Sequence, residues 1–200
     1  MSDNQGEIRP VYKIVNVVAT STVDIQEKID LIKIAQKHKD VEYNPERFPG
    51  LVMRIKEPSG TVLVFSTGKF VITGLKKTED AEKVIKKVIK NIKKSGINVS
   101  NPQIQIVNLV ASGDLYLNID LNMAAVLLEY AMYEPEVFPG LILRMKEPKA
   151  VFLIFSTGKI VCTGITQDEF IKEAMNKLYI QIKDLGISRD FNDEGNDLES

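Results

Sequence analysis

Few residues in this sequence could catalyse a reaction or hold a metal ion. Its 200 residues include one histidine, His38, and one cysteine, Cys162. A catalytic triad needs a histidine beside a nucleophile, and zinc sites need several histidine or cysteine ligands. A single cysteine also excludes an intramolecular disulfide and a thiolate metal cluster. The sequence therefore predicts a protein that is not an enzyme, with no catalytic residues, no metal and no cofactor.

One segment has the composition of a phosphate-binding loop but the wrong spacing. In such a loop the two glycines stand five residues apart, and a Ser or Thr follows the lysine. Here Gly60 stands eight residues before Gly68, and Phe70 follows Lys69. The segment therefore does not predict nucleotide binding.

Polar side chains inside apolar strands indicate a different chemistry. Asn16 and Thr73 interrupt β-branched runs, and Asn108 and Thr163 hold matching places further along the chain. Amide and hydroxyl groups can donate hydrogen bonds. Which ligand they could bind depends on the elements that present them.

The chain is a tandem duplication of a unit of about 90 residues. Residues 43–74 align with residues 133–164 at an offset of 90, with 20 of 32 positions identical. Upstream, residues 14–19 match residues 106–111 at an offset of 92, so a two-residue difference falls in the segment that holds the first helix. Two copies are too few for a solenoid array. We expect two related units with pseudo-two-fold symmetry.

Each copy is expected to contain five strands and two helices. A short helix is predicted over residues 27–37 and a long amphipathic helix over residues 78–95. β-Branched runs separated by turn residues predict strands in the first copy over residues 12–19, 41–47, 51–56, 61–65 and 69–73.

The ends of the long helices carry capping signals. Thr78 is expected to be the N-cap of the first long helix, and Gly96 is expected to end it. In the second copy, Thr166 and Glu169 are expected to form a capping box, and Gly186 is expected to end the helix.

The strands carry apolar side chains on both faces of the expected sheet. Hairpin connections predict an antiparallel sheet, in which apolar and polar residues normally alternate. Residues 62–65 and 151–155 are apolar throughout. Since the helices can cover only one face, the other is expected to be an exposed apolar interaction surface. A closed barrel or sandwich that buries both faces is the alternative.

Successive side chains of a strand point to opposite faces, so residue parity sorts the two faces. The helix side is expected to hold Val15, Val17, Val62, Val64, Phe70 and Ile72, with Cys162 as a small buried hydrophobe. The open face would show Asn16, Val18, Leu63, Phe65, Val71 and Thr73 in the first copy, and Asn108, Val110, Leu153, Phe155, Val161 and Thr163 in the second.

This open face suits the minor groove of A·T-rich DNA. An A·T pair offers only acceptors there, adenine N3 and thymine O2, which match amide and hydroxyl donors. Packed Val and Leu side chains leave no room for the guanine amino group. Cations at the rim could meet phosphates, and phenylalanines could wedge between base steps. The candidate cations are Arg54, Lys56, Lys69, Arg144, Lys146 and Lys159, and the candidate wedges are Phe48, Phe65, Phe138 and Phe155.

Charge is distributed unevenly along the chain, although the formal net charge is only −1. Residues 1–100 carry 18 Lys and Arg against 12 Asp and Glu, whereas residues 101–200 carry 8 against 15. This is compatible with separate basic and acidic surfaces, and with drift between the two halves. The first residues lack the apolar core of a signal peptide, and no apolar run approaches the roughly 20 residues needed to span a bilayer. No membrane partner is expected.

These blocks resemble the conserved core of the TATA-box-binding proteins. The resemblance covers residues 9–189, and both copies carry Asn-x-Val, Phe-Pro-Gly-Leu, the Glu-Pro turn and Phe-Ser-Thr-Gly-Lys-x-Val-x-Thr-Gly. It implies an α+β fold, a pseudo-two-fold saddle of two tandem repeats with a ten-stranded curved antiparallel sheet and four helices on its convex side. The repeats would span residues 9–97 and 98–189, between a disordered N-terminus (1–8) and an acidic disordered tail (190–200).

The resemblance also implies roles for individual residues by matching position. Arg47 has no basic counterpart, because Val137 stands at its place. DNA intercalation falls to Phe48, Phe65, Phe138 and Phe155. Contacts to bases and groove walls fall to Asn16, Val18, Leu63, Val71, Thr73, Asn108, Val110, Leu153, Val161 and Thr163. Phosphate contacts fall to Arg47, Arg54, Lys69, Arg144 and Lys159.

The implied function is that of a general transcription factor that binds and bends a TATA element and nucleates the preinitiation complex. The implied partners are double-stranded DNA, transcription factor B and, through the initiation complex, RNA polymerase. Glu134 and Glu136 match the loop, or stirrup, that contacts transcription factor B in this family. The lack of a long N-terminal extension, together with Pro49-Gly50, makes the chain resemble archaeal members, which implies a cytoplasmic protein on the nucleoid; a eukaryotic member would be nuclear.

Some alternatives stay open on the residues alone. A homodimer could hide the apolar face in the absence of DNA. A small-molecule carrier of the helix-grip type would need a closed cavity and would have no affinity for DNA. A substrate-recognition module of a nucleic-acid enzyme would need a separate catalytic domain and would not bind transcription factor B.

Overall fold

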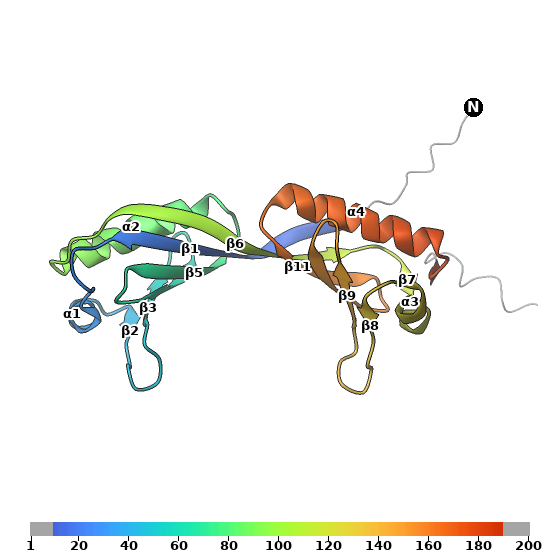
Figure 1. Cartoon of the computed structure of the whole chain (residues 1–200), viewed down its shortest axis with the longest axis horizontal. Helices are drawn as coiled ribbons and strands as arrows, with labels where there is room; N and C mark the ends of the chain where they lie inside the picture. Colours follow the sequence, from blue (N-terminus) through green and yellow to red (C-terminus); the bar gives the residue numbers. More distant parts are fainter. Residues whose placement is uncertain (1–9, 190–200) are drawn as a thin grey trace, which may run out of the picture. The chain divides into compact units, whose positions relative to one another are not determined.

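The computed structural model describes residues 10–189, so the two segments predicted to be disordered, 1–8 and 190–200, lie outside the described residues. Ten strands of this part form one sheet in the order β2-β3-β4-β5-β1-β6-β11-β10-β9-β8, and β7 pairs with β12 in a separate two-stranded sheet (Figure 1). The predicted α+β class, with a ten-stranded antiparallel sheet and four helices, is confirmed by this topology.

The elements follow the same order in both copies. The helices are α1 (Leu31–Lys37), α2 (Asp80–Lys94), α3 (Leu121–Leu127) and α4 (Asp168–Asp184). The strands of the first copy are β1 (Val11–Asp24), β2 (Val41–Glu42), β3 (Leu51–Ile55), β4 (Gly60–Val64) and β5 (Lys69–Leu75). Those of the second copy are β6 (Ser100–Asp114), β7 (Asn118–Ile119), β8 (Ala131–Met132), β9 (Leu141–Met145), β10 (Ala150–Ile154), β11 (Lys159–Ile165) and β12 (Ser188–Arg189).

The chain forms two compact units. The N-repeat unit comprises residues 15–109. The C-repeat unit combines the segment up to Ile14 with the segment from Val110 onward. The first residues of β1 therefore pack with the second copy, and the Tyr12 hydroxyl donates a hydrogen bond to Asp168 Oδ1 at the start of α4 (3.1 Å).

The core of the N-repeat unit lies between α2 and one face of its strands. α2 buries Ala81, Val84, Ile85, Val88 and Ile92, which recur at helical spacing. The strand residues on this side are fully buried: Val17, Val62, Val64, Phe70 and Ile72. Val15, predicted on the same side, is only half buried.

The C-repeat unit repeats this arrangement. α4 buries Ile171, Ala174, Met175, Leu178 and Ile182. The strand side of the core contains Phe152, Ile154, Ile160 and Cys162, all at most 2% exposed. Cys162 lies where parity predicted it, and burial raises the pKa of its thiol to about 12.

The short helix of the first copy begins later than predicted. α1 begins at Leu31, because the Asp30 carboxylate accepts the Lys33 N–H (3.0 Å) and caps the helix there. Asp120 caps α3 in the same way by accepting the Met123 N–H (2.9 Å).

The predicted strand over residues 41–47 is much shorter in the structure. β2 ends at Glu42. Beyond it, Asn44 Oδ1 accepts the Glu46 N–H (3.2 Å), and the Asn44 carbonyl accepts the N–H groups of Arg47 and Phe48 (3.1 and 3.0 Å). Pro45 has no N–H to offer to a ladder. Residues 43–50 therefore form a turn-rich loop rather than a strand.

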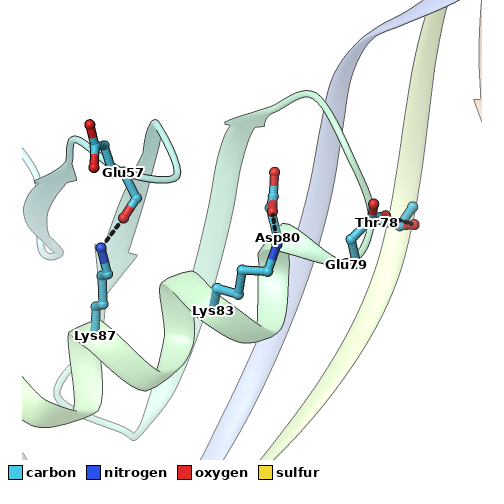
Figure 2. Close-up of polar contacts among 6 residues, drawn as sticks. All are labelled: Glu57, Thr78, Glu79, Asp80, Lys83 and Lys87. Carbon is cyan, nitrogen blue, oxygen red and sulfur yellow. Dashed lines mark hydrogen bonds and ion pairs between the residues drawn. The ribbon is translucent and has the colours of Figure 1, made fainter.

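The predicted N-caps of the long helices were wrong, whereas their C-terminal glycines were right. The N-cap of α2 is Glu79, and the Thr78 hydroxyl instead donates to Glu79 Oε2 (3.4 Å; Figure 2). The N-cap of α4 is Gln167, without a side-chain capping bond, so Thr166 and Glu169 form no capping box. Gly96 and Gly186 end the helices with φ of 76° and 64°, a left-handed conformation that favours glycine.

The two-residue difference between the copies lies just before the first helix of each. Val23 N–H bonds Gly68 O and Leu115 N–H bonds Gly158 O, so the offset is still 92 at the end of the long strands. Ile29 N–H bonds Ser66 O and Ile119 N–H bonds Ser156 O, which restores the offset of 90. The shorter connection of the second copy is therefore confined to residues 116–118.

Candidate nucleic-acid interface

The open face of the N-repeat unit presents a row of half-buried side chains. Val52 on β3 pairs with Leu63 on β4, Leu63 pairs with Val71 on β5, and Val71 pairs with Thr20 on β1. Each lies between fully buried neighbours on its strand. The face opposite the helix is therefore apolar across β3, β4 and β5, with the Thr20 side chain of β1 beside it, as residue parity indicates.

The C-repeat unit has a matching face. Ile142 on β9 pairs with Leu153 on β10, which pairs with Val161 on β11. These three side chains are half buried, whereas Phe152 and Ile154 on the other side of β10 are fully buried. Val110 and Thr163 are also half buried and have the parity of this face. Asn108, near the end of the N-repeat unit, is half buried too.

A hydrogen bond fixes the orientation of the Asn16 amide. Asn16 Oδ1 accepts the backbone N–H of Gly74 (2.8 Å), and Asn16 Nδ2 lies 3.4 Å from Thr73 Oγ1. Because a backbone N–H can only donate, the oxygen of the amide must face Gly74. The NH₂ group is therefore the part of Asn16 that can donate to a ligand on the open face.

Two phenylalanine pairs stand beside these faces. Phe48 and Phe65 meet edge to face with ring centroids 5.8 Å apart, and Phe138 and Phe155 do so at 5.9 Å. Phe48 is 38% exposed, an unusual position for a large aromatic side chain. Each pair combines one ring from a loop with one from the residue that directly follows a strand.

The glycine of each Phe-Pro-Gly motif makes room for these rings, a role that the sequence did not reveal. A Cβ atom at Gly50 would lie 2.7 Å from Phe48 Cε1 and 3.0 Å from Phe65 Cε1. At Gly140 it would lie 2.7 Å from Phe138 Cε1 and 3.1 Å from Phe155 Cε1. The sequence signal that could have revealed this role is a repeated pattern: in both copies Phe-Pro-Gly precedes one strand, and a Phe follows the next strand.

The predicted phosphate ligands differ in their local partners. Arg54 forms an ion pair with Glu42 (2.7 Å), and both side chains are largely exposed. Arg144 is exposed, and Met132 stands at the position that corresponds to Glu42. Within residues 10–189, neither the Arg144 nor the Lys69 side chain forms an ion pair or hydrogen bond.

Lys159 is held by a carboxylate that sequence reasoning missed. Its Nζ lies 2.5 Å from Asp114 Oδ2, and Asp114 Oδ1 accepts the Tyr116 N–H (2.9 Å). The hydrogen bond to Asp114, reinforced by its charge, raises the pKa of Lys159. Burial alone would raise the pKa of Asp114, but its hydrogen bonds from Lys159 and from the Tyr116 N–H, together with the Lys159 charge, lower it. Asp114 stands an even number of residues after Asn108, and this spacing could have placed it on the open face from the sequence alone.

The two acidic residues of the second stirrup are exposed. We define the first stirrup as residues 43–50 and the second as residues 133–140. In the second, the Glu134 carbonyl accepts the N–H groups of Val137 and Phe138, both at 2.9 Å. Glu134 and Glu136 project from this loop as exposed side chains, as does Glu46 from the first stirrup.

Other reactive side chains have structural roles. His38 Nε2 lies 3.0 Å from the Asn91 carbonyl and 3.2 Å from Ser95 Oγ, which joins the end of α1 to α2. Several lysines of α2 also have local partners: Lys83 pairs with Asp80 (2.7 Å), and Lys87 donates to the Glu57 carbonyl (Figure 2). In residues 10–189 no cluster of three potential metal ligands occurs, and no helix is long and apolar enough to cross a membrane.

Comparison with known proteins places the chain in a family. The family model for "Transcription factor TFIID (or TATA-binding protein, TBP)" matches residues 11–95 and again residues 103–185. The chain belongs to the TATA-binding protein family. It is therefore related to DNA-binding transcription factors that are not enzymes.

Relatives and a solved structure agree over most of the chain. The chain is 49% identical to the TATA-box-binding protein of Pyrodictium occultum over 182 residues, 90% of each chain. It is 48% identical to that of Pyrobaculum neutrophilum over 179 residues, 89% of this chain and 90% of the relative. The structure of Methanococcus jannaschii TBP matches with a TM-score of 0.79 and 45% identity, covering 86% of this chain and 98% of that one. Membership of this family decides against the carrier and the enzyme-module alternatives.

Proposed function

We propose that the chain binds the TATA element of promoters in the minor groove, through the open sheet faces of its two units. The observation that carries this proposal is the face around Asn16. There the Gly74 N–H holds the amide oxygen, so that the amide NH₂ stands as a donor among half-buried aliphatic side chains. Such a face complements adenine N3 and thymine O2 acceptors.

Discrimination against G·C pairs follows from the aliphatic rows. Leu63 and Val71 in one unit, and Leu153 and Val161 in the other, form neighbouring pairs with no polar atom in their side chains. A guanine amino group pressed against such a pair loses its hydrogen bonds to water and gains no acceptor. An unsatisfied buried donor costs roughly 1–3 kcal/mol.

Bending of the DNA is assigned to the phenylalanine pairs. Inserted apolar side chains unstack base steps and kink the duplex, a behaviour already known for the TATA-binding protein family. The exposed ring of Phe48 and the half-buried rings of Phe65, Phe138 and Phe155 are placed beside the open faces. The exposed cations Arg47, Arg54, Lys69 and Arg144 would bind the phosphates and fix the register.

A DNA-bending titration tests this proposal. A TATA duplex and a G·C-rich duplex of equal length, labelled at both ends, are titrated with wild type and with Phe155→Ala while energy transfer is measured. We expect bending of the TATA duplex alone, and weaker bending by Phe155→Ala. Equal binding of wild type to the two duplexes would refute minor-groove recognition of the TATA element.

We further propose that the second stirrup recruits transcription factor B and that this complex recruits RNA polymerase. The support is the exposed pair Glu134 and Glu136, of which Glu134 has a neutral counterpart, Asn44, in the first stirrup. Glu136→Arg should abolish a supershift of the DNA complex by factor B. The matched variant Glu46→Arg, at the equivalent place of the first stirrup, should leave it intact. Recruitment by Glu136→Arg at the wild-type level would remove this assignment.

A further inference from the structure

Asp114 places a carboxylate on the proposed DNA-binding face of the C-repeat unit. It is the last residue of β6, and its parity is that of Asn108 and Val110. Asp114, Phe155, Lys159 and Val161 line one surface cleft of about 500 Å³. The Asp114 carboxylate therefore lies among the residues expected to contact DNA, where a negative charge opposes phosphates.

The N-repeat unit has no carboxylate at the equivalent position. The offset of 92 fixed by the Val23–Gly68 and Leu115–Gly158 hydrogen bonds makes Thr22 the counterpart of Asp114. Thr22 pairs with Lys69 across β1 and β5, just as Asp114 contacts Lys159. The nearest acidic residue on this strand, Asp24, is its last residue, and its carboxylate accepts a hydrogen bond from Asn101 Nδ2 (2.8 Å).

The two matching lysines are therefore in different electrostatic states. Lys159 is neutralised by a carboxylate at 2.5 Å whose side chain is only 14% exposed. Within residues 10–189, the Lys69 side chain has no such partner. A phosphate that approaches Lys159 must compete with Asp114 and is repelled by it, whereas one that approaches Lys69 meets an unpaired ammonium group.

The asymmetry extends to a second pair of positions. Arg47 in the first stirrup is exposed, and Val137 stands at its place in the second. Both differences favour phosphate contact by the N-repeat unit. Arg54 and Arg144 differ in the opposite sense, because Arg54 pairs with Glu42 (2.7 Å) whereas Arg144 forms no ion pair within residues 10–189.

We infer that Asp114 weakens the attraction between the C-repeat unit and DNA phosphates. The N-repeat unit then makes most of the contacts to the DNA backbone, and the C-repeat unit contributes mainly apolar contacts in the groove. This inference rests on the proposed binding of a TATA element. It assigns to Asp114 a positioning role, because Asp114 acts on DNA through Lys159 and through its own charge.

A double-mutant cycle tests the inference. Affinity for one TATA duplex is measured at several salt concentrations for wild type, Lys69→Ala, Lys159→Ala, Asp114→Asn and the double variant Asp114→Asn/Lys159→Ala. Asn at position 114 keeps an acceptor for the Tyr116 N–H, so the local turn is retained. Each phosphate contact contributes about −0.9 to the slope of log affinity against log salt.

We expect Lys69→Ala to make this slope shallower by about 0.9 and Lys159→Ala to leave it nearly unchanged. Asp114→Asn should steepen the slope by about 0.9 and raise affinity roughly three- to tenfold, a gain that Lys159→Ala should then remove. The reciprocal variant Thr22→Asp should act like Lys69→Ala. Glu82→Gln, which removes a carboxylate paired with Lys86 on α2, is the charge-matched control and should change nothing.

The outcomes separate this inference from the proposed function. If wild type does not prefer the TATA duplex, the proposed function fails. If wild type prefers it and Lys69→Ala and Lys159→Ala change the slope equally, the function stands and the inference is overturned. The inference is also overturned if Asp114→Asn binds DNA as wild type does.

Discussion

At the scale of single residues, the interface depends on which atoms are already engaged inside the protein. The amide oxygen of Asn16 is occupied by the Gly74 N–H, and this leaves the NH₂ as donor. The ammonium group of Lys159 is occupied by Asp114, whereas that of Lys69 has no partner within residues 10–189. Equivalent residue types in the two copies therefore need not have equivalent functions.

The orientation of the Asn16 amide can be tested by replacing only its donor. Asn16→Asp keeps an acceptor for the Gly74 N–H but replaces the NH₂ by an anionic oxygen that faces acceptor atoms of the groove. We expect a loss of TATA affinity of roughly 10- to 100-fold, the size of a specific base contact. Fluorescence anisotropy measures this loss, and unchanged thermal unfolding shows that the fold is retained. Wild-type affinity of Asn16→Asp would contradict the role of this amide.

The ion pair of Asp114 and Lys159 predicts a pH dependence of stability. The pKa of Asp114 is lowered in the folded protein, so its charged form stabilises the fold above the ordinary Asp pKa of about 3.9, and this stabilisation is lost as pH falls through the lowered value. Wild type should therefore unfold at a higher temperature than Asp114→Asn at pH 7. The difference should shrink as the pH is lowered below about 4, as measured by thermal unfolding. A difference that is the same at pH 7 and at pH 3 would contradict this.

At the scale of elements, a phenylalanine pair packs on a glycine where each of the two stirrups meets the strand that follows it. Phe-Pro-Gly reads locally as a turn signal, yet Gly50 is buried under the rings of Phe48 and Phe65. The glycine is therefore required by packing rather than by backbone conformation. Similarly, α1 begins at Leu31 because the carboxylate of its N-cap, Asp30, can reach the Lys33 N–H, even though apolar residues continue upstream.

The packing of these rings gives a prediction for Gly50→Ala and Gly140→Ala. The added methyl group would displace Phe48 or Phe138, and because both are exposed or half-buried side chains, the free energy of unfolding should change by less than about 1 kcal/mol. DNA bending should nevertheless decrease, as measured by energy transfer between the ends of a TATA duplex. Pro49→Ala, in the same loop and without a new atom facing the rings, is the control. Wild-type bending by both glycine variants would show that the ring geometry is unimportant.

At the scale of the whole molecule, a duplicated fold has diverged in charge. The formal net charge of −1 conceals an uneven distribution of basic residues, because residues 1–100 carry 18 Lys and Arg and residues 101–200 carry 8. The binding of a polyanion by a nearly neutral chain then has to rely on a few local cations. Arg47, Arg54, Lys69 and Arg144 are exposed, and within residues 10–189 only Arg54 of these four has an ion-pair partner, Glu42.

The number of these cations predicts the salt dependence of binding. Four phosphate contacts correspond to a slope of log affinity against log salt of about −3.6 for double-stranded DNA. Titration of one TATA duplex between 50 and 300 mM salt, roughly the range over which such slopes are measured, gives this value. A slope near zero would mean that these cations do not contact phosphates.

Much of the architecture is determined by the sequence alone. The 90-residue repeat, the two-sided apolar strands, and the periodicity of the long helices predict two copies of a helix-backed antiparallel sheet with one open face. These are patterns of side-chain type with a period of about 2.0 or 3.6 residues, and hydrophobic burial enforces them wherever a core must form. Parity alone assigned Val62 and Phe70 to the core and Leu63 and Val71 to the open face.

Other features were decided only by tertiary contacts. Whether Thr78 or Glu79 caps α2, and where β2 ends, depends on hydrogen bonds between a few atoms whose energies differ by about 1 kcal/mol. The pairing of Lys159 with Asp114 joins residues 45 positions apart, and the contact of Gly50 with Phe65 joins a loop to the end of another strand. Sequence periodicity carries no information about such distances, because they are set by how strands register against one another. The difference between the two lysines therefore became visible only when their surroundings were known.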